Sequence, residues 1–183
     1  DKDAEAFYLA LHAFSMEFKD GHVGLDGGAL ADPFISSSIS TGYGFAVREL
    51  DDGRVIVVYV TPGGEAARAG IQEGAQITEF NGEPVAAAIG RVQVPEPQST
   101  DFALRYQQAC YLLRAPLGAT AKIKYTNPGT NQAAEATLLS GNEYASFSVT
   151  YIFTGYDPNV LPVEYQVLDS GIGYVRVNSN YDD

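Results

Sequence analysis

Glycine, proline and asparagine recur from Gly42 to Leu139 and divide most of this stretch into short segments. Residues 42–50 are a β-rich run, and Asp51-Asp52-Gly53 separates them from a second β-rich run at 54–60. Turn residues between two such runs are typical of a β-hairpin. This stretch therefore predicts a sheet of short strands with a few short helices.

The same signals divide the whole stretch into elements. In chain order we predict strands at 42–50 and 54–60, a short helix at 65–70, a strand at 76–80, a connection with three prolines at 84–100, a helix at about 101–114, and strands at 120–126 and 134–139. Gly70 can end the first helix, because glycine readily adopts the conformation that follows a last helical turn. Ser99-Thr100-Asp101 can cap the second helix.

Residues 4–18 contain no glycine or proline and have apolar residues at helical spacing. One face of this predicted helix carries an aromatic-rich stripe, made by Phe7, Leu11, Phe14 and Phe18. We expect the helix to end at Lys19-Asp20-Gly21 and a loop to follow at 26–40. Beyond residue 141, two more strand-like runs lie at 144–153 and 171–179.

Composition and charge exclude several classes of protein. The chain has 183 residues, enough to bury a core without disulfide bonds, and its single cysteine excludes a four-cysteine zinc site. With 23 acidic and 11 basic residues its formal charge is −12, which repels phosphate backbones, so we expect no nucleic-acid partner. An apolar run of about 18 residues is missing, so we expect no membrane span.

Composition does not decide in which cellular compartment the protein lies. The first residues, Asp1-Lys2-Asp3-Ala4, lack the apolar core of a signal peptide and are predicted to be a fragment boundary or a mature terminus. Low cysteine content and an acidic surface fit extracytoplasmic and cytosolic proteins nearly equally. Our expectation is an extracytoplasmic location: periplasmic, cell-surface or secreted.

The loop at the start of the first strand is a candidate binding site. Gly42 and Gly44 allow backbone angles closed to other residues and can bring several N–H groups together, which suits a carboxylate. The strand from Phe45 through Ala46 can then pair with an arriving peptide by strand addition. The plainer alternative is that both glycines only shape the entrance to a hairpin.

Three motifs in this order resemble a PDZ domain. Gly42-Tyr43-Gly44-Phe45 is similar to the loop that binds a peptide's terminal carboxylate, and 62–82 is similar to the family's second signature. Residues 112–126 are similar to the end of the peptide-flanking helix with the next strand, whereas Ala75 departs from the usual aspartate. The resemblance implies an α+β fold: a PDZ-like partly open β-barrel with two helices, preceded by an N-terminal helix.

The resemblance also implies which side chains would contact a peptide. Tyr106 and Cys110 would occupy the two helix positions that face the peptide, beside the loop residues Tyr43, Gly44, Phe45 and Ala46. With these two at the groove we expect an apolar terminal residue in the peptide. The alternative is that Tyr106 and Cys110 belong to the core.

Motifs on both sides of the PDZ segment indicate a more specific family. Asp20-Gly21-His22 before the PDZ segment and Ile172-Gly173-Tyr174-Val175-Arg176 after it resemble the tail-specific, or C-terminal processing, serine peptidases and their tricorn-core relatives. The implied organisation is an N-terminal helical segment at 1–37, a PDZ domain at 38–140, and connecting strands with the start of a truncated catalytic core at 141–183. Motifs that would hold the nucleophilic serine are missing, so this chain is predicted to be inactive alone.

His22 has two interpretations. In the branch that uses serine and histidine it would be the general base, because the pKa of imidazole lies near neutrality. In the serine–lysine branch it would only order the turn after the helix. His12 and His22 show no metal-binding spacing, and nothing predicts a cofactor.

The sequence supports one leading function and two alternatives. The leading one is the PDZ portion of a serine endopeptidase that binds and processes protein C-termini. The first alternative is a non-catalytic PDZ adaptor that binds a partner's C-terminal peptide. The second is a vestigial PDZ domain whose groove is covered by 84–100 or by the flanks.

Overall fold

The protein is described here by a computed structural model, which covers residues 2–25, 40–150, 161 and 163–177. The backbone packs as two units, Asp1–Tyr151 and Ile152–Asp183. The expected divisions after residues 37 and 140 stay predictions, and the first of them lies outside the described residues.

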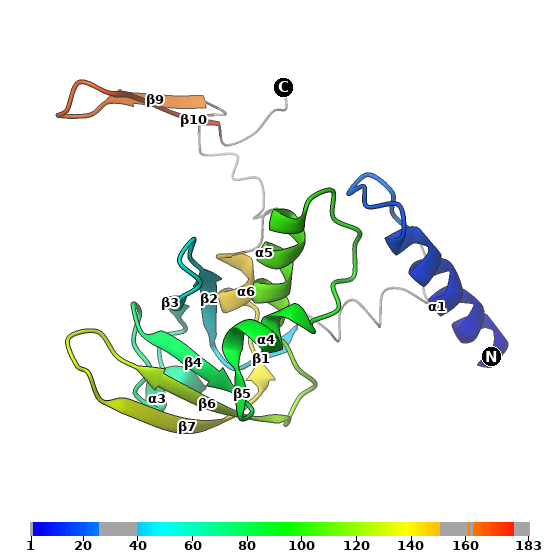
Figure 1. The fold of residues 1–183 in the computed structure, drawn as a ribbon, viewed down its shortest axis with the longest axis horizontal. Helices are drawn as coiled ribbons and strands as arrows, with labels where there is room; N and C mark the ends of the chain where they lie inside the picture. Colours follow the sequence, from blue (N-terminus) through cyan, green and yellow to red (C-terminus); the bar gives the residue numbers. More distant parts are fainter. Residues whose placement is uncertain (1, 26–39, 151–160, 162, 178–183) are drawn as a thin grey trace. The chain divides into compact units, whose positions relative to one another are not determined.

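An antiparallel sheet of six strands forms the centre of the first unit (Figure 1). Five strands lie in the order β2-β3-β4-β6-β7, with bounds Phe45–Glu49, Val55–Val60, Gln76–Phe80, Thr120–Thr126 and Ala133–Leu139. The short β5 (Glu83–Pro84) pairs with β4. Among the described residues β2 and β7 do not pair with each other, so the sheet stays open. This confirms the predicted α+β, partly open architecture.

A second, very short pair of strands lies just before β2. β1 (Thr41–Gly42) pairs antiparallel with β8 (Gly141–Asn142). Residues about one hundred positions apart are therefore adjacent, and the chain that follows β8 starts beside the loop that precedes β2.

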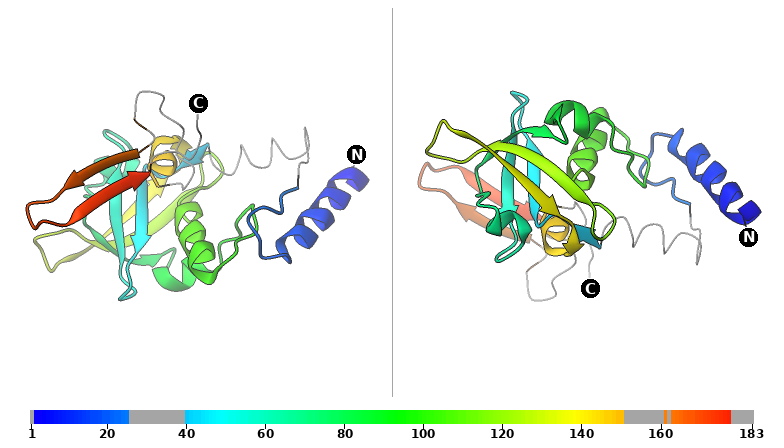
Figure 2. Two further views of the ribbon diagram at one scale, coloured as in Figure 1. Left: turned by 90° about the horizontal axis from the view of Figure 1, so that it is seen from above. Right: turned by 90° about the horizontal axis from the view of Figure 1, so that it is seen from below.

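In the described part of the chain four helices pack with the sheet. They are α3 (Glu65–Arg68), α4 (Val85–Gly90), α5 (Asp101–Tyr111) and α6 (Ala145–Ser148). α5 lies alongside β2, and Figure 2 shows the curled sheet and this helix from two further sides. The side chain of Thr100 accepts a hydrogen bond from the backbone N–H of Ala103 at 3.0 Å, which confirms the predicted cap.

Two sequence predictions about these helices need correction. Residues 144–150, predicted as strand, contain helix α6, while 151–153 lie outside the described residues. The Glu143 carboxylate accepts hydrogen bonds from the backbone N–H and the hydroxyl of Ser146, which start a helical turn there. Within the connection predicted at 84–100, α4 forms because its buried residues Val85, Ala88 and Ile89 pack into the core.

The core lies between the sheet and its helices. Its largest fully buried side chains come from β2, β3, α4, β6 and β7: Phe45, Val47, Val55, Val57, Ile89, Ile123 and Leu138. Alternate residues of β6 face this core, as expected for a strand with one covered face. The core thereby fixes β2 in place from one side.

The N-terminal helix α1 covers Lys2–Met16, ending two residues earlier than predicted. Its predicted aromatic stripe is exposed at all four positions, Phe7, Leu11, Phe14 and Phe18. The buried positions near it are Tyr8 and Ser15, and the His12 ring bonds the Pro95 carbonyl at 2.6 Å. This helix contacts the rest of the chain through Tyr8, His12 and Ser15, on a face beside the aromatic stripe and not through the stripe itself.

The second unit is a single hairpin in its described part. β9 (Val163–Val167) pairs antiparallel with β10 (Gly173–Val177), so the run predicted at 171–179 forms a strand in its described residues. Every described residue of the two strands is exposed, including Tyr165 and Val175. A two-stranded hairpin is marginal in water, so it needs a covering partner for stability.

Candidate peptide-binding groove

A groove runs between β2 and α5. In the described part of the chain β2 has one hydrogen-bonded neighbour, β3, so its other edge is free to face α5. Arg48 on β2 reaches across to α5, where its guanidinium lies 3.9 Å from the centre of the Tyr106 ring. An edge strand facing a helix is the arrangement by which a peptide can be added as a further strand.

The loop before β2 owes its shape to two glycines, each for a different reason. Gly44 has φ 79°, a left-handed conformation that favours glycine, and its carbonyl accepts a bond from the Thr61 N–H at 2.9 Å. Gly42 is not left-handed, which corrects the prediction of special backbone angles at both positions. A Cβ on Gly42 would lie 2.5 Å from Nη1 of Arg114 and 2.8 Å from the Leu113 carbonyl. Gly42 is therefore needed for a close approach.

The side chains predicted to bind a peptide near this loop are buried. Tyr43 contacts Phe80 with ring centres 6.3 Å apart, and burial raises the pKa of the Tyr43 hydroxyl. Phe45 and Ala46 are buried as well, with Phe45 in the main core. At these positions the backbone is what remains for a ligand to contact.

The two predicted helix residues, Tyr106 and Cys110, do lie on the groove. Another segment of the same chain already contacts both of them there. The Thr150 carbonyl accepts hydrogen bonds from Tyr106 Oη at 2.5 Å and from Arg48 Nη2 at 2.7 Å. Cys110 Sγ lies 3.6 Å from the same oxygen. A single carbonyl thus joins β2 to α5 across the groove. Burial raises the pKa of Tyr106, which keeps its hydroxyl protonated.

A buried ion pair holds the segment that supplies this carbonyl. Arg114 Nη1 lies 3.0 Å from Glu143 Oε1, with side chains only 2% and 11% exposed. Ser146 and Thr61 also donate to the Glu143 carboxylate, at 2.7 and 2.9 Å. Burial by itself would raise the pKa of Glu143, but the bonds from Ser146, Arg114 and Thr61 outweigh burial and hold it below its ordinary value.

Helix α6 completes the cover. Phe147 is buried against Cys110, Tyr111 and Val94, and its ring centre lies 5.1 Å from that of Tyr111. We call the part of the groove covered by residues 143–150 the closed end. It starts next to the Gly42–Phe45 loop, where β1 pairs with β8, and ends at Arg48 and Tyr106, which donate hydrogen bonds to the Thr150 carbonyl.

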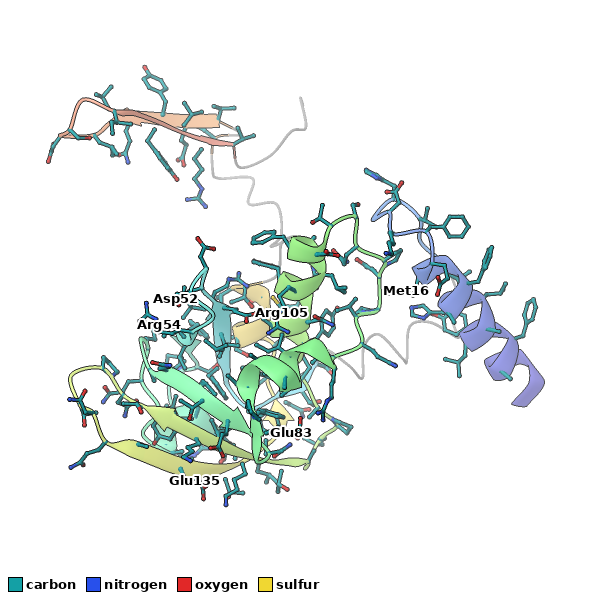
Figure 3. All side chains as sticks on the ribbon, in the orientation of Figure 1. Met16, Asp52, Arg54, Glu83, Arg105 and Glu135 are labelled. Carbon is teal, nitrogen blue, oxygen red and sulfur yellow. The ribbon has the colours of Figure 1, made fainter. Side chains whose placement is uncertain are left out.

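The other end of the groove is open. A cavity of about 970 Å³ lies where β2 turns into β3 and α5 begins. Its lining comes from these two elements and the turn between the strands: Arg48, Glu49, Leu50, Asp51, Asp52, Gly53, Asp101, Phe102, Arg105, Tyr106 and Ala109. Figure 3 shows Asp52 and Arg54 at the β2–β3 turn and Arg105 on α5. We call this part the open end.

One comparison with known protein families matches part of the chain. The PDZ domain model matches residues 34–90, which include the loop, β2, β3 and α3 through α4. This part of the chain is a PDZ domain. No curated protein matches the sequence.

Several solved structures match the chain at low sequence identity and low TM-score. The photosystem II D1 C-terminal processing protease is 18% identical at a TM-score of 0.42, over 93% of this chain and 41% of that chain. Mature CPAF is 15% identical at 0.47, over 99% and 50%. The HtrA-type protease AlgW with a decapeptide is 17% identical at 0.39, over 62% and 33%. The chain thus spans half or less of the length of these three proteins.

His22 lies on a turn outside the PDZ groove. Its side chain is 96% exposed, and its Nδ1 lies 2.9 Å from Oδ1 of Asp20. The same oxygen accepts the backbone N–H of His22 at 3.0 Å, and these bonds lower the pKa of Asp20. Both predicted roles fit this geometry, since Asp20 orders the turn and also orients the ring. The described residues contain no cluster suited to a metal ion, and no described helix is long and apolar enough to cross a membrane.

Four residues that define the groove were missed as site residues: Arg48, Arg114, Glu143 and Thr150. Arg114 falls inside a motif that the sequence did reveal, the Leu-Arg before the glycine turn of the PDZ domain. Glu143 and Thr150 had no signal, since nothing local shows that residues after β8 return to the groove.

Proposed function

We propose that this chain is the peptide-recognition portion of a serine endopeptidase that processes protein C-termini outside the cytoplasm. The observation that carries the proposal is the groove itself, with the free edge of β2 facing α5 and the glycine loop at its start. A C-terminal peptide would add to β2 as a strand, with its carboxylate at the loop.

The peptidase part of the proposal comes from the flanking motifs. Asp20-Gly21-His22 precedes the PDZ domain, and Gly173-Tyr174-Val175-Arg176 lies on β10. The exposed apolar residues of the β9–β10 hairpin suit a first piece of a larger domain, in which they would be covered. The nucleophile would come from that domain, and His22 would act as general base only if the partner residues are serine and glutamate.

Binding of a terminus at the loop requires the closed end to open. The Thr150 carbonyl accepts hydrogen bonds from Arg48 and Tyr106. Glu143 forms an ion pair with Arg114, the buried cation nearest the loop. A peptide carboxylate would compete with Glu143 for this cation, and the peptide backbone would replace Thr150. The resting groove is therefore closed to termini, and any variant that loosens 143–150 should bind them more tightly.

Two peptides that differ only at the terminus test this function. One ends in a free carboxylate after an apolar residue, and its twin ends in an amide. We expect the free acid to bind at least about tenfold more tightly by fluorescence anisotropy, because a buried charge-assisted bond is lost in the amide. Phe147→Ala should raise the affinity for the acid, and Phe7→Ala, at an exposed position on α1 away from the groove, is the matched control and should leave it unchanged. Equal binding of acid and amide in all variants would contradict recognition of termini.

The peptidase assignment has its own test. Sequence of the gene beyond the codon for Asp183 should encode a serine with a downstream lysine, or a serine with a glutamate. The lysine form would leave His22 structural, and the glutamate form would make it the base. A stop codon there would overturn the assignment and favour a PDZ adaptor.

A further inference from the structure

The open end of the groove has the size and position of a binding site in its own right. Its cavity of about 970 Å³ is at the upper end of the range typical for ligand pockets. It lies at the Glu49 end of β2, away from the glycine loop at the Phe45 end. Nothing assigned to the carboxylate loop uses it.

The strand edge continues into this cavity. The Leu50 N–H bonds the Arg54 carbonyl at 2.8 Å, so Leu50 faces the neighbouring strand β3. Because successive residues of a strand alternate, the backbone N–H and carbonyl of Glu49 point away from β3, toward the free edge. A peptide can therefore pair with the strand here even while 143–150 covers the closed end.

Apolar surface lines part of the cavity. Phe102 is 78% exposed and its ring centre lies 6.4 Å from that of Tyr106, while Leu50 is also exposed. Large exposed aromatic side chains beside a strand edge are typical of surfaces that bind a partner.

The charge of the cavity selects the partner. Its two arginines are already engaged: Arg105 pairs with Glu49, and Arg48 bonds Thr150 and Tyr106. Asp51 and Asp101 have no cationic partner among the described residues, and Asp52 faces only the exposed Arg54. The open end thus presents unpaired carboxylates, and the chain's charge of −12 adds to its attraction for cations.

We propose that the open end binds an extended protein segment, away from its terminus, in which lysine or arginine lies next to apolar residues. The basic side chains would lie against Asp51 and Asp101, and the apolar ones on Phe102. The inference uses the groove of the proposed function but does not depend on recognition of a carboxylate. It adds a second, charge-selective subsite to the same groove.

The experiment uses the whole chain and a fluorescein-labelled peptide in which lysine and leucine alternate, acetylated and amidated so that no terminus can be recognised. A twin peptide has glutamate in place of lysine. We expect the lysine peptide to bind and the twin to bind at least about tenfold more weakly, with affinity falling as salt is added.

Two sets of variants locate the binding. Asp51→Asn with Asp101→Asn should weaken the lysine peptide by about tenfold at low salt. Glu83→Gln with Glu135→Gln removes the same charge from the far strands, where both side chains are exposed (Figure 3), and should change little. Phe102→Ala should weaken binding without changing its salt dependence.

The outcomes separate this inference from the proposed function. Equal losses in the two double variants would mean general attraction to an acidic protein and would overturn the inference. So would equal binding of the lysine and glutamate peptides. Neither result affects the comparison of free acid with amide, which tests recognition of termini alone.

Discussion

The two ends of one groove differ in how they treat charge. At the closed end Arg114 and Glu143 are 2% and 11% exposed, and hydrogen bonds from Ser146 and Thr61 complete the pair. At the open end Arg105 and Glu49 form a comparable pair with side chains 31% and 20% exposed. A buried pair is costly to break on one side, whereas a half-buried pair that water still reaches contributes less. The groove thus has one end held closed by a buried ion pair and one end open to a partner.

Removing the cation at each end measures this difference most strongly. Arg114→Ala leaves Glu143 buried without its partner and should lower the free energy of unfolding by about 3–5 kcal/mol. Arg105→Ala should lower it by less than about 1 kcal/mol. Urea unfolding of both variants gives the values. Similar losses would mean that the two ends are not distinct.

The glycine loop should respond according to what each glycine does. Gly42→Ala pushes a methyl group into Arg114 and the Leu113 carbonyl and should cost about 2 kcal/mol. Gly44→Ala places alanine at φ 79° and should cost about 1 kcal/mol. Thermal unfolding compares the two. A larger loss for Gly44→Ala would contradict the close approach of Arg114 to the loop.

Tyr106→Phe removes two hydrogen bonds, the one donated to the Thr150 carbonyl and the one accepted from Arg48, and keeps the ring under Arg48. We expect a loss of about 1–2 kcal/mol, measured by urea unfolding. Tyr106→Phe should also speed amide hydrogen exchange in 145–150. Unchanged exchange there would show that the Thr150 contact does not hold the segment.

Lowering the pH should destabilise the closed end gradually, and by less than the substitutions above. The pKa of Glu143 is lower in the folded chain, so its contribution is complete above the ordinary carboxyl pKa of about 4.3 and is lost as the pH falls through the lowered value. Arg114 stays protonated throughout. Glu143→Gln should therefore lose less stability on acidification than the unchanged chain, as followed by unfolding at successive pH values. Parallel curves for the two would rule out this contribution.

The features that could be predicted from sequence depend on neighbours in the chain. The Asp51-Asp52-Gly53 hairpin, the Thr100 cap and the short helix before Gly70 are formed by contacts between residues a few positions apart, so local patterns suffice. The same holds for the PDZ motifs, which are runs of consecutive residues.

The cover of the groove could not be predicted in this way. Arg114 and Glu143 are 29 positions apart, and Thr150 meets Arg48 from 102 positions away. The alternating run at 144–153 reads as a strand, yet Glu143, held by Arg114, starts a helix there instead. Tertiary contacts overrode the local pattern. The sequence suggests a covered groove as one alternative, but it does not identify the residues that cover it.

The central claim is that residues 143–150 and a C-terminal peptide compete for the end of the groove next to the glycine loop. Amide chemical shifts of the ¹⁵N-labelled chain, recorded with the free-acid peptide and with its amide twin, test it most directly. The account predicts that the free acid shifts the signals of Gly42–Ala46 and of Ala145–Thr150 together, and that the amide leaves both sets in place. Shifts at Gly42–Ala46 with none at 145–150, or the same shifts from both peptides, would contradict it.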